Sequence, residues 1–311
     1  MLHDLRLTAL CLTLALTIAL ALGACTGGNG QYRTIRLKSG DAAAVISTPA
    51  PVGNSVRVAV ASVISPKGTV ESYSGLLSYL SQRLDRPVEL VQRQTYAETN
   101  DLIKRGAVEL AFVCSGAYVQ GQQEAAMELL AVPQVSGETV YYSNIIVPYD
   151  NPAQSFAQLR GKVFAFTDPL SNSGYLATAY LLETMGSHPG AFFRRTIYTY
   201  SHDNSIKAVA EGLVDGASVD SLVYDYALAR DATLAKRVRV IARSAPYGMP
   251  PVVVPRGLDP ELKARLRQVL MGMHEEEQGA IVLEDLMIDR FVPPDDTAYD
   301  SIRAMLASVA K

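Results

Sequence analysis

The segment KVFAFTDPLSNSGY, residues 162–175, decides the fold class of this chain. Its first five residues, Lys162–Phe166, form an apolar run that is typical of a buried strand. Apolar side chains then recur at helical spacing over Gly174–Met185. A strand that leads directly into a helix is the repeating unit of an α/β protein.

Three small polar side chains stand between this strand and this helix. Ser171, Asn172 and Ser173 are uncharged hydrogen-bond donors, and Gly174 lets another group approach the backbone closely. A helix start also exposes free backbone N–H groups at the positive end of the helix dipole, which suits an anion. An ordinary helix cap explains one such side chain but not three. The turn is therefore interpreted either as an anion site or as a plain cap.

The same alternation continues along the chain. Strand-like runs are found at residues 56–62, 88–92, 109–113, 162–166, 196–200 and 217–220. Helical spacing is found at residues 72–84, 96–105, 174–185, 204–211, 260–273 and 298–309. Two extended segments, near 140–147 and 238–245, interrupt the pattern. We therefore expect an α/β fold with two hinge segments, in which residues 55–139 plus 246–311 form lobe one and 142–240 form lobe two.

The N-terminal residues have the features of a bacterial lipoprotein signal. The apolar run Leu7–Leu22 is shorter than the roughly 20 residues that a membrane span needs. It ends at Ala24-Cys25, which is similar to a lipobox, so we expect a signal peptide over residues 1–24 and a palmitate-bearing lipid anchor on Cys25. The alternative is an ordinary cleaved signal with an incidental cysteine. Residues 25–54, rich in Gly, Ser, Thr and Ala, predict a flexible tether.

Composition excludes several classes of function. The net charge is −3 and no basic cluster appears, so nucleic acid is not an expected partner. Cys11 leaves with the signal and Cys25 carries lipid, so Cys114 has no partner for a disulfide. No Cys or His spacing indicates a metal site, and no cofactor is expected.

Two further strand-to-helix turns carry chemically active side chains. His202, in the turn Ser201–Ser205, could donate to an anion, more strongly when protonated, or it could be a solvated residue of the cap. Cys114 and Ser115 follow the strand at 109–113, at the edge that faces a cleft between lobes. Cys114 is interpreted either as a small buried hydrophobe or as a thiol in the cleft.

Two tyrosines complete the set of candidates. Tyr118 and Tyr73 each lie at a helix start near these turns, where they could contact a ligand or simply pack in the core. All the turns offer neutral donors with scarcely any Lys or Arg. Buried neutral donors avoid the desolvation cost of a buried cation, so the set favours a dehydrated oxyanion.

These turns resemble those of the phosphate/phosphite/phosphonate-binding proteins of ABC transporters, over about residues 55–305. The resemblance is carried by the segments Glu109–Phe112, Ser171–Gly174, Ser201–Asp203 and Val214–Ala217. It implies a two-lobed fold like that of type II periplasmic binding proteins, outside the cytoplasm. It implies that the oxyanion is held by Ser171, Asn172, Ser173 and His202, that Tyr73 and Tyr118 close from lobe one, and that Asp220 and Ser221 face the ligand's variable group.

The leading hypothesis is therefore a monomeric binding lipoprotein, not an enzyme, that delivers phosphonate, phosphite or phosphate to a permease. Asn172 stands where the family often has Thr, and Cys114 where it often has Gly. The cysteine resembles a related branch of arsenite or arsenate sensors that signal to a histidine kinase, since a thiolate is a soft ligand. The third hypothesis is a hydrolase that uses Ser173 and His202, although the G-x-S-x-G elbow is lacking.

Overall fold

The computed structural model describes residues 54–124 and 126–309. The predicted signal peptide, the predicted lipidation site at Cys25 and the predicted tether up to residue 53 lie outside the described residues. Within the described part, no helix is both long and apolar enough to cross a membrane. The same residues contain no group of three or more His, Cys, Asp and Glu side chains that is placed to hold a metal.

The first sheet has six strands in the order β13-β4-β12-β3-β1-β2. Strands β1, β2 and β3 run parallel, whereas β12 is antiparallel to β3 and β4, and β13 is antiparallel to β4. The strands are β1 (Val56–Val60), β2 (Val88–Val91), β3 (Leu110–Phe112), β4 (Met127–Gln134), β12 (Val252–Pro255) and β13 (Arg290–Val292).

The second sheet has five strands in the order β10-β6-β9-β7-β8. Strand β7 is parallel to β8 and β9, and β6 is antiparallel to β9 and β10. The strands are β6 (Ser143–Pro148), β7 (Val163–Phe166), β8 (Arg195–Tyr198), β9 (Gly216–Asp220) and β10 (Val238–Arg243).

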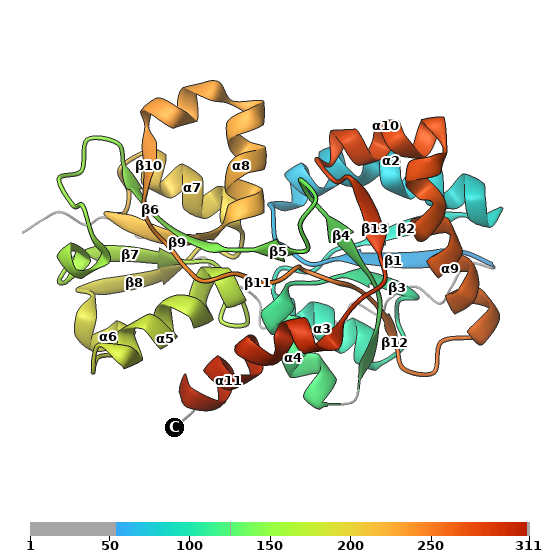
Figure 1. Cartoon of the computed structure of the whole chain (residues 1–311), viewed down its shortest axis with the longest axis horizontal. Coiled ribbons are helices and arrows are strands. Elements are labelled where there is room, and N and C mark those ends of the chain that lie inside the picture. Colours follow the sequence, from blue (N-terminus) through green and yellow to red (C-terminus); the bar gives the residue numbers. More distant parts are fainter. Residues whose placement is uncertain (1–53, 125, 310–311) are drawn as a thin grey trace, which may run out of the picture. The chain divides into compact units, whose positions relative to one another are not determined.

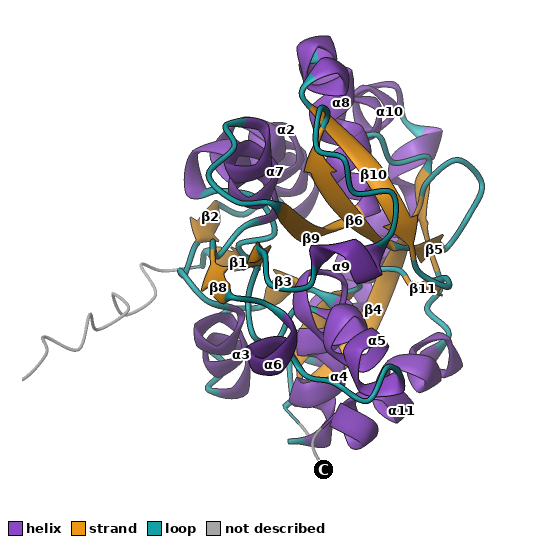
Figure 2. Ribbon diagram, turned by 90° about the vertical axis from the view of Figure 1, so that its left-hand side faces the viewer, coloured by secondary structure: helices purple, strands orange, loops and turns teal. Residues whose placement is uncertain are grey.

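Helices cover both faces of each sheet (Figures 1 and 2). One face of the first sheet packs against α2 (Pro66–Leu84), α9 (Pro260–Gly272) and α10 (Glu277–Asp285), and the other against α3 (Tyr96–Lys104), α4 (Ser115–Gln123) and α11 (Asp300–Val309). The second sheet lies between α7 (His202–Ala210) with α8 (Ser221–Arg230) and α5 (Ala177–Thr184) with α6 (Pro189–Phe192). Short turns of helix are η2 (Phe156–Leu159), η3 (Asn172–Leu176), η4 (Ala232–Lys236), η5 (Met273–Glu275) and η6 (Asp296–Tyr299).

A two-stranded ribbon connects the sheets. It consists of β5 (Val140–Tyr141) and β11 (Tyr247–Gly248), which pair antiparallel in the middle of Figure 1. The neighbouring strands β6 and β10 lie in the ranges predicted as hinges and form the antiparallel edge of the second sheet. That these segments act as hinges stays a prediction.

The α/β class predicted from the segment at 162–175 is confirmed, since β7 leads through η3 into α5. The sequence analysis did not identify β4, β12, α8 or α10. Strand β12 is flanked by prolines and fully buried, so it shows no alternation of apolar and polar residues.

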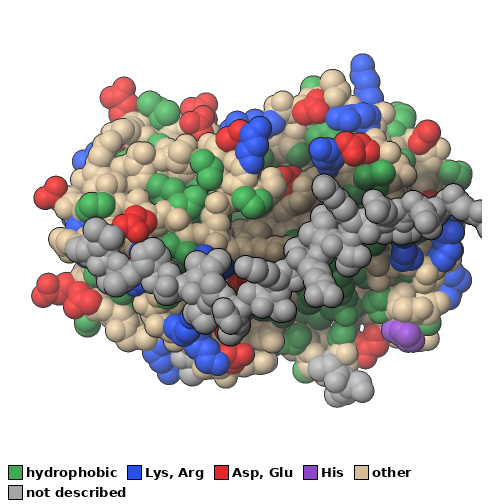
Figure 3. Space-filling model, turned by 180° about the vertical axis from the view of Figure 1, so that it is seen from behind, with side chains coloured by type: hydrophobic (Ala, Val, Ile, Leu, Met, Phe, Trp, Pro, Cys, Tyr) green, Lys and Arg blue, Asp and Glu red, His purple; other side chains and the backbone are tan. Residues whose placement is uncertain are grey.

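Charged side chains of both signs lie among one another on the described part of the face in Figure 3. The charge pattern of that face agrees with the small net charge of −3.

Candidate oxyanion-binding site

Four helices begin at the ends of strands around one buried polar cluster. The residues that cap these helices are Cys114 for α4, Ser171 for η3, Ser201 for α7 and Asp220 for α8. All four are at most 2% exposed. Because a helix start carries free N–H groups and the positive end of a dipole, the cluster favours negative charge.

The turn after β7 has an unusual first turn of helix. Residues Asn172–Leu176 form a π-helix, in which Leu176 N–H donates to Ser171 O over 2.9 Å. The hydroxyl of Ser171 accepts the N–H of Gly174 over 3.0 Å. Asn172 and Ser173 are the first residues of this helix, so their N–H groups have no partner in an earlier turn, as an anion site requires.

The starts of α4 and η3 touch each other. A Cβ atom at Gly116 would lie 2.5 Å from the carbonyl oxygen of Leu170 and 2.8 Å from the backbone nitrogen of Asn172. The Tyr141 hydroxyl, on the connecting ribbon, accepts from Ser115 Oγ over 2.7 Å and from Asn172 Nδ2 over 3.0 Å. Only glycine permits this approach between the two sheets' turns.

Several buried polar atoms in this cluster have no hydrogen-bond partner among the described residues. Four of them are Tyr96 Oη, Asn172 Oδ1, Ser173 Oγ and His202 Nε2, and we call these four atoms the cradle; Ser201 Oγ, at the start of α7, is a fifth such atom in the cluster. Tyr96 lies at the start of α3 and is fully buried. Such atoms are costly to bury unsatisfied, so a group that hydrogen-bonds to them has a place here.

The contacts of the cradle residues hold them near one another. Burial raises the pKa of Tyr96 well above its ordinary value, and the nearby Cys114 and Asp220 raise it further. The backbone N–H of Asp220 donates to Nδ1 of His202 over 3.0 Å. Ser173 is also close to Asp220, because its side chain is among the groups that lower the pKa of that carboxyl.

His202 is a neutral donor. Its Nδ1 accepts from the backbone of Asp220, so the ring proton resides on Nε2, which points to no described partner. Burial lowers the pKa of His202 to about 3. The expectation of a stronger, protonated donor was therefore wrong, because a fully buried imidazole loses its hydration when charged.

Asp220 is the acidic group beside the cradle. Burial raises its pKa to about 7, although the N–H groups of Leu222 and Val223 oppose that shift. Its Oδ1 accepts the N–H of Leu222 over 2.8 Å, which caps α8. Near neutral pH the carboxyl is thus partly protonated and can itself donate to an oxyanion.

Cys114 is buried in the same cluster. Burial raises its pKa, and the backbone N–H groups of Asn172 and Gly116 partly offset that rise. The thiol lies 3.9 Å from the Ser171 hydroxyl. It is therefore a buried, neutral thiol between the two helix starts, where it also packs against Ala61 and Ala117. That it contacts a ligand stays a prediction.

Not every predicted residue reaches the cradle. Tyr118 donates its hydroxyl to Asp296 over 2.6 Å and packs on Tyr299, so its predicted closing role is not supported. Tyr73 packs edge-on against Phe112 and lines a neighbouring apolar cavity instead.

Two predicted hydroxyls of the turns are engaged within the protein. Ser115 donates its hydroxyl to Tyr141, and Ser171 uses its oxygen as the cap of η3. Ser173 and His202 form no hydrogen bond with each other, since neither Ser173 Oγ nor His202 Nε2 has a described partner. The pair required by the hydrolase hypothesis is therefore not formed.

Sequence reasoning did not identify Tyr96 and Tyr141. Tyr96 follows a cap, Thr95, whose hydroxyl accepts the N–H of Glu98 over 3.2 Å, so the helix start itself was detectable. Its backbone N–H donates to Asp168 over 3.1 Å, a contact between turns of the two sheets. Tyr141 lies in β5, inside the extended segment predicted near 140–147, but that pattern does not indicate that its hydroxyl reaches Ser115 and Asn172.

Comparisons with known proteins agree with this geometry. Residues 58–299 match the family described as ABC transporter, phosphonate, periplasmic substrate-binding protein. The chain is 26% identical over 314 residues to the phosphate-import protein PhnD of Mycolicibacterium smegmatis, with 94% of this chain and 93% of that protein covered. The resemblance drawn from the turns is thereby confirmed.

Solved structures of low identity share the fold. A binding-protein component of an ABC phosphonate transporter from Pseudomonas aeruginosa has a TM-score of 0.78 at 24% identity, with 83% of this chain and 87% of that chain covered. PhnD1 from Prochlorococcus marinus, solved in complex with methylphosphonate, has a TM-score of 0.75 at 17% identity, with 83% and 99% covered. The predicted type II periplasmic-binding-protein fold is confirmed.

Proposed function

The chain belongs to the family of periplasmic phosphonate-binding proteins of ABC transporters, and we propose that its cradle holds the oxyanion of a small phosphonate. The family consists of binding proteins, so the chain is an extracytoplasmic substrate-binding protein of a phosphonate or phosphate importer and not an enzyme. The tetrahedral head group is the part of the ligand that the cradle would recognise.

One observation carries this proposal. The four cradle atoms come from three helix starts and have no partner among the described residues: Tyr96 Oη, Asn172 Oδ1, Ser173 Oγ and His202 Nε2. Hydroxyl, amide and imidazole N–H groups donate hydrogen bonds to phosphoryl oxygens without the cost of burying a cation. If the side-chain amide of Asn172 is turned by half a rotation, its Nδ2 takes the place of Oδ1 and donates to the ligand. The amide oxygen and nitrogen are nearly equal in size, so both orientations fit the same space.

The protonation state of Asp220 suits different classes of ligand. With a ligand whose substituent is uncharged, the protonated carboxyl donates to the oxyanion. With an aminophosphonate, the ionised carboxyl pairs with the ammonium group. Because burial raises the pKa of Asp220 to about 7, a large share of the carboxyl is protonated near neutral pH, as the first class requires.

Closure of two lobes accompanies binding in this proposal. Contacts between turns of the two sheets support it, such as the backbone N–H of Ser65 that donates to Asp203 over 2.8 Å. A ligand that touches both turns would favour the closed arrangement by its extra contacts. We propose the ranges 140–147 and 238–245, with the ribbon beside them, as the hinge between residues 55–139 plus 246–311 and residues 142–240.

The remaining parts of the proposal concern attachment and partner. A lipid on Cys25 would hold the protein to the membrane, and the tether up to residue 54 would give it reach. The partner is the importer's permease, which receives the ligand from a monomeric binding protein. Radioactive palmitate incorporated into the wild type but not into Cys25→Ala would support the anchor, and equal labelling would overturn it.

Titration calorimetry tests the ligand class. Phosphate, phosphite, methylphosphonate and 2-aminoethylphosphonate are compared on the wild type and on Ser173→Ala. We expect saturable binding of a phosphonate that weakens at least about tenfold in the variant, because one charge-assisted hydrogen bond is lost. Sulfate serves as the control anion. Binding of no phosphorus oxyanion would contradict the proposal.

The position of Cys114 keeps the arsenite-sensor hypothesis as a second candidate. Its thiol faces the N–H groups of Asn172 and Gly116, inside the cluster. The raised pKa opposes the thiolate that a soft metalloid would need. Arsenite binding that Cys114→Ser abolishes, together with no phosphonate binding, would favour the sensor; phosphonate binding that survives Cys114→Ser would exclude it.

A further inference from the structure

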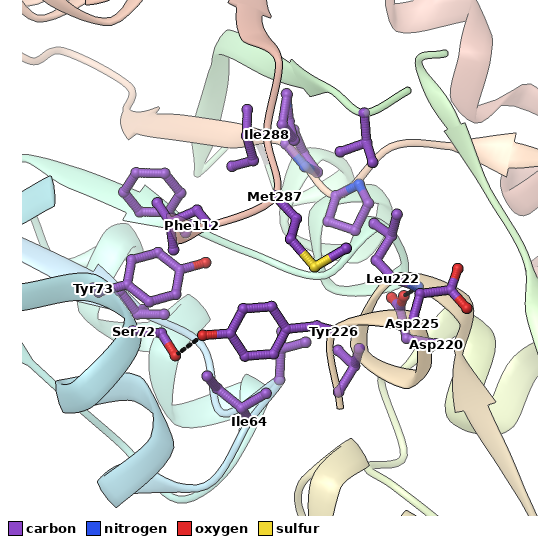
Figure 4. Close-up of a pocket in the computed structure, with 18 of the residues that line it drawn as sticks. Ile64, Ser72, Tyr73, Phe112, Asp220, Leu222, Asp225, Tyr226, Met287 and Ile288 are labelled. Carbon is purple, nitrogen blue, oxygen red and sulfur yellow. Dashed lines mark hydrogen bonds between the residues drawn. The ribbon is translucent and has the colours of Figure 1, made fainter. Parts of the chain in front are cut away.

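A second cavity lies beside the cradle and differs from it in chemistry. It measures about 220 Å³ and is lined mainly by apolar side chains from both sheets' elements. We call it the vestibule and define it by Tyr73, Phe112, Leu222, Tyr226 and Met287, which Figure 4 shows around one space. These residues come from α2, β3, α8 and the turn between α10 and β13.

The vestibule meets the cradle at Asp220. The side chain of Asp220 lines the vestibule, while its backbone N–H donates to Nδ1 of His202 over 3.0 Å. Val63 also lines the vestibule, and its carbonyl oxygen accepts the backbone N–H of His202 over 2.9 Å. Because the Asp220 carboxyl is also close to the side chain of Ser173, the vestibule adjoins the cradle on the side of Ser173 and Asp220.

The charges around the vestibule select against an anionic substituent. Asp220 and Asp225 line it, and no Lys or Arg side chain is among its lining residues. Burial raises the pKa of Asp225, as it does that of Asp220. A second negative group on the ligand would be desolvated here without a cation to pair with it.

The walls of the vestibule favour an apolar group of some size. Tyr73 and Tyr226 present aromatic rings to the space, and Met287 contributes a flexible thioether (Figure 4). Ser72 and Tyr226 hydrogen-bond over 2.7 Å, which joins α2 to α8 at the same cavity. A methyl group would leave most of the 220 Å³ to water.

We propose that the protein's preferred ligand is an organophosphonate whose substituent is an uncharged, apolar group of several non-hydrogen atoms, such as phenyl. The inference rests on the proposed function, because the head group occupies the cradle while the substituent fills the vestibule. Since affinity grows with the apolar area removed from water, phenylphosphonate should bind at least about tenfold tighter than methylphosphonate.

Titration calorimetry with methylphosphonate, propylphosphonate and phenylphosphonate tests this ligand class. The variant Met287→Trp places a larger side chain in the vestibule without touching the cradle. It should weaken phenylphosphonate about tenfold and leave methylphosphonate within about twofold. Met185→Trp is the matched control, because Met185 and Met287 are both 41% exposed and Met185 lies outside the vestibule.

The possible outcomes separate this inference from the proposed function. If methylphosphonate binds and the larger phosphonates bind no tighter, the inference is wrong and the proposed function stands. The same holds if Met287→Trp weakens both ligands equally. If no phosphonate binds, the proposed function itself is contradicted. If Met287→Trp fails to fold, the affinities of the wild type for methyl-, propyl- and phenylphosphonate test the inference without a variant.

Discussion

The turns of the second sheet and those of the first contribute differently to the cradle. The second sheet's turns carry Asn172, Ser173 and His202, each at a helix start. The first sheet's turns contribute Tyr96 and the close backbone contact at Gly116. One sheet therefore carries most of the unpartnered polar atoms, whereas the turns of the other pack against them.

Gly116→Ala should break this arrangement most strongly. The added methyl group would meet backbone atoms of Leu170 and Asn172 at 2.5 and 2.8 Å, which cannot move aside like a side chain. Overpacking of this kind costs about 1–3 kcal/mol, so we expect methylphosphonate to bind up to about 100-fold more weakly.

The matched control is Gly272→Ala, at the end of α9, where a Cβ atom meets nothing within 4 Å. Calorimetry on both variants would check the expectation. Wild-type affinity in Gly116→Ala would show that the contact between the turns plays no part in binding.

Ser173→Ala and Tyr96→Phe compare one donor from each sheet. Each change removes a single hydroxyl that has no described protein partner. We expect Ser173→Ala to weaken methylphosphonate by about 30-fold and Tyr96→Phe by about fivefold, because the second sheet holds the head group. Calorimetry measures both affinities. A larger loss of affinity in Tyr96→Phe than in Ser173→Ala would mean that the first sheet holds the head group.

The affinity for an uncharged-substituent phosphonate should fall as the pH rises through about 7. Ionisation of Asp220, whose pKa is raised to about 7, places a negative charge beside the anion. Between about pH 6 and 8 the loss should approach tenfold, and it should be absent from Asp220→Asn once the ligand's own titration is subtracted. His202, with a pKa of about 3, adds no dependence in this range.

Asp220 should also affect the stability of the ligand-free protein. Folding raises its pKa from 3.8 to about 7, so the folded state loses stability as the pH rises between these values. Asp220→Asn should therefore raise the free energy of unfolding at about pH 8 by roughly 4 kcal/mol at most. The gain should vanish below about pH 4, because the carboxyl is then protonated in both states.

Urea unfolding of the two proteins at several pH values measures this effect. His202 acts with the opposite sign, since its pKa falls from 6.5 to about 3 on folding, and stability is lost as the pH falls. The two effects offset each other between about pH 4 and 6.5 in the wild type. A variant with no gain at about pH 8 would mean that Asp220 is not desolvated.

Sequence patterns correctly predicted the features that depend on local order along the chain. Ser171 to Ser173 and His202 lie in the short turns that connect β7 and β8 to the next helices, so their place at helix starts was predictable from order along the chain. Prediction from the sequence was wrong for properties that depend on tertiary packing. The charge state of His202 depends on burial, and the orientation of Tyr118 depends on Asp296, which lies 178 positions away in the sequence.

The vestibule was not predictable for the same reason. Its walls combine Tyr73, Leu222 and Met287, which come from three distant helices or turns. No spacing in the sequence indicates that these side chains share one space. Only the strand order of the two sheets and their connections bring them together.

A crystal structure of the protein with methylphosphonate tests the central claim most directly. We predict phosphoryl oxygens about 3 Å from Ser173 Oγ, His202 Nε2 and the Asn172 amide, with no Lys or Arg in contact. A ligand bound in the vestibule alone, or held by a cationic side chain, would contradict the neutral-donor cradle.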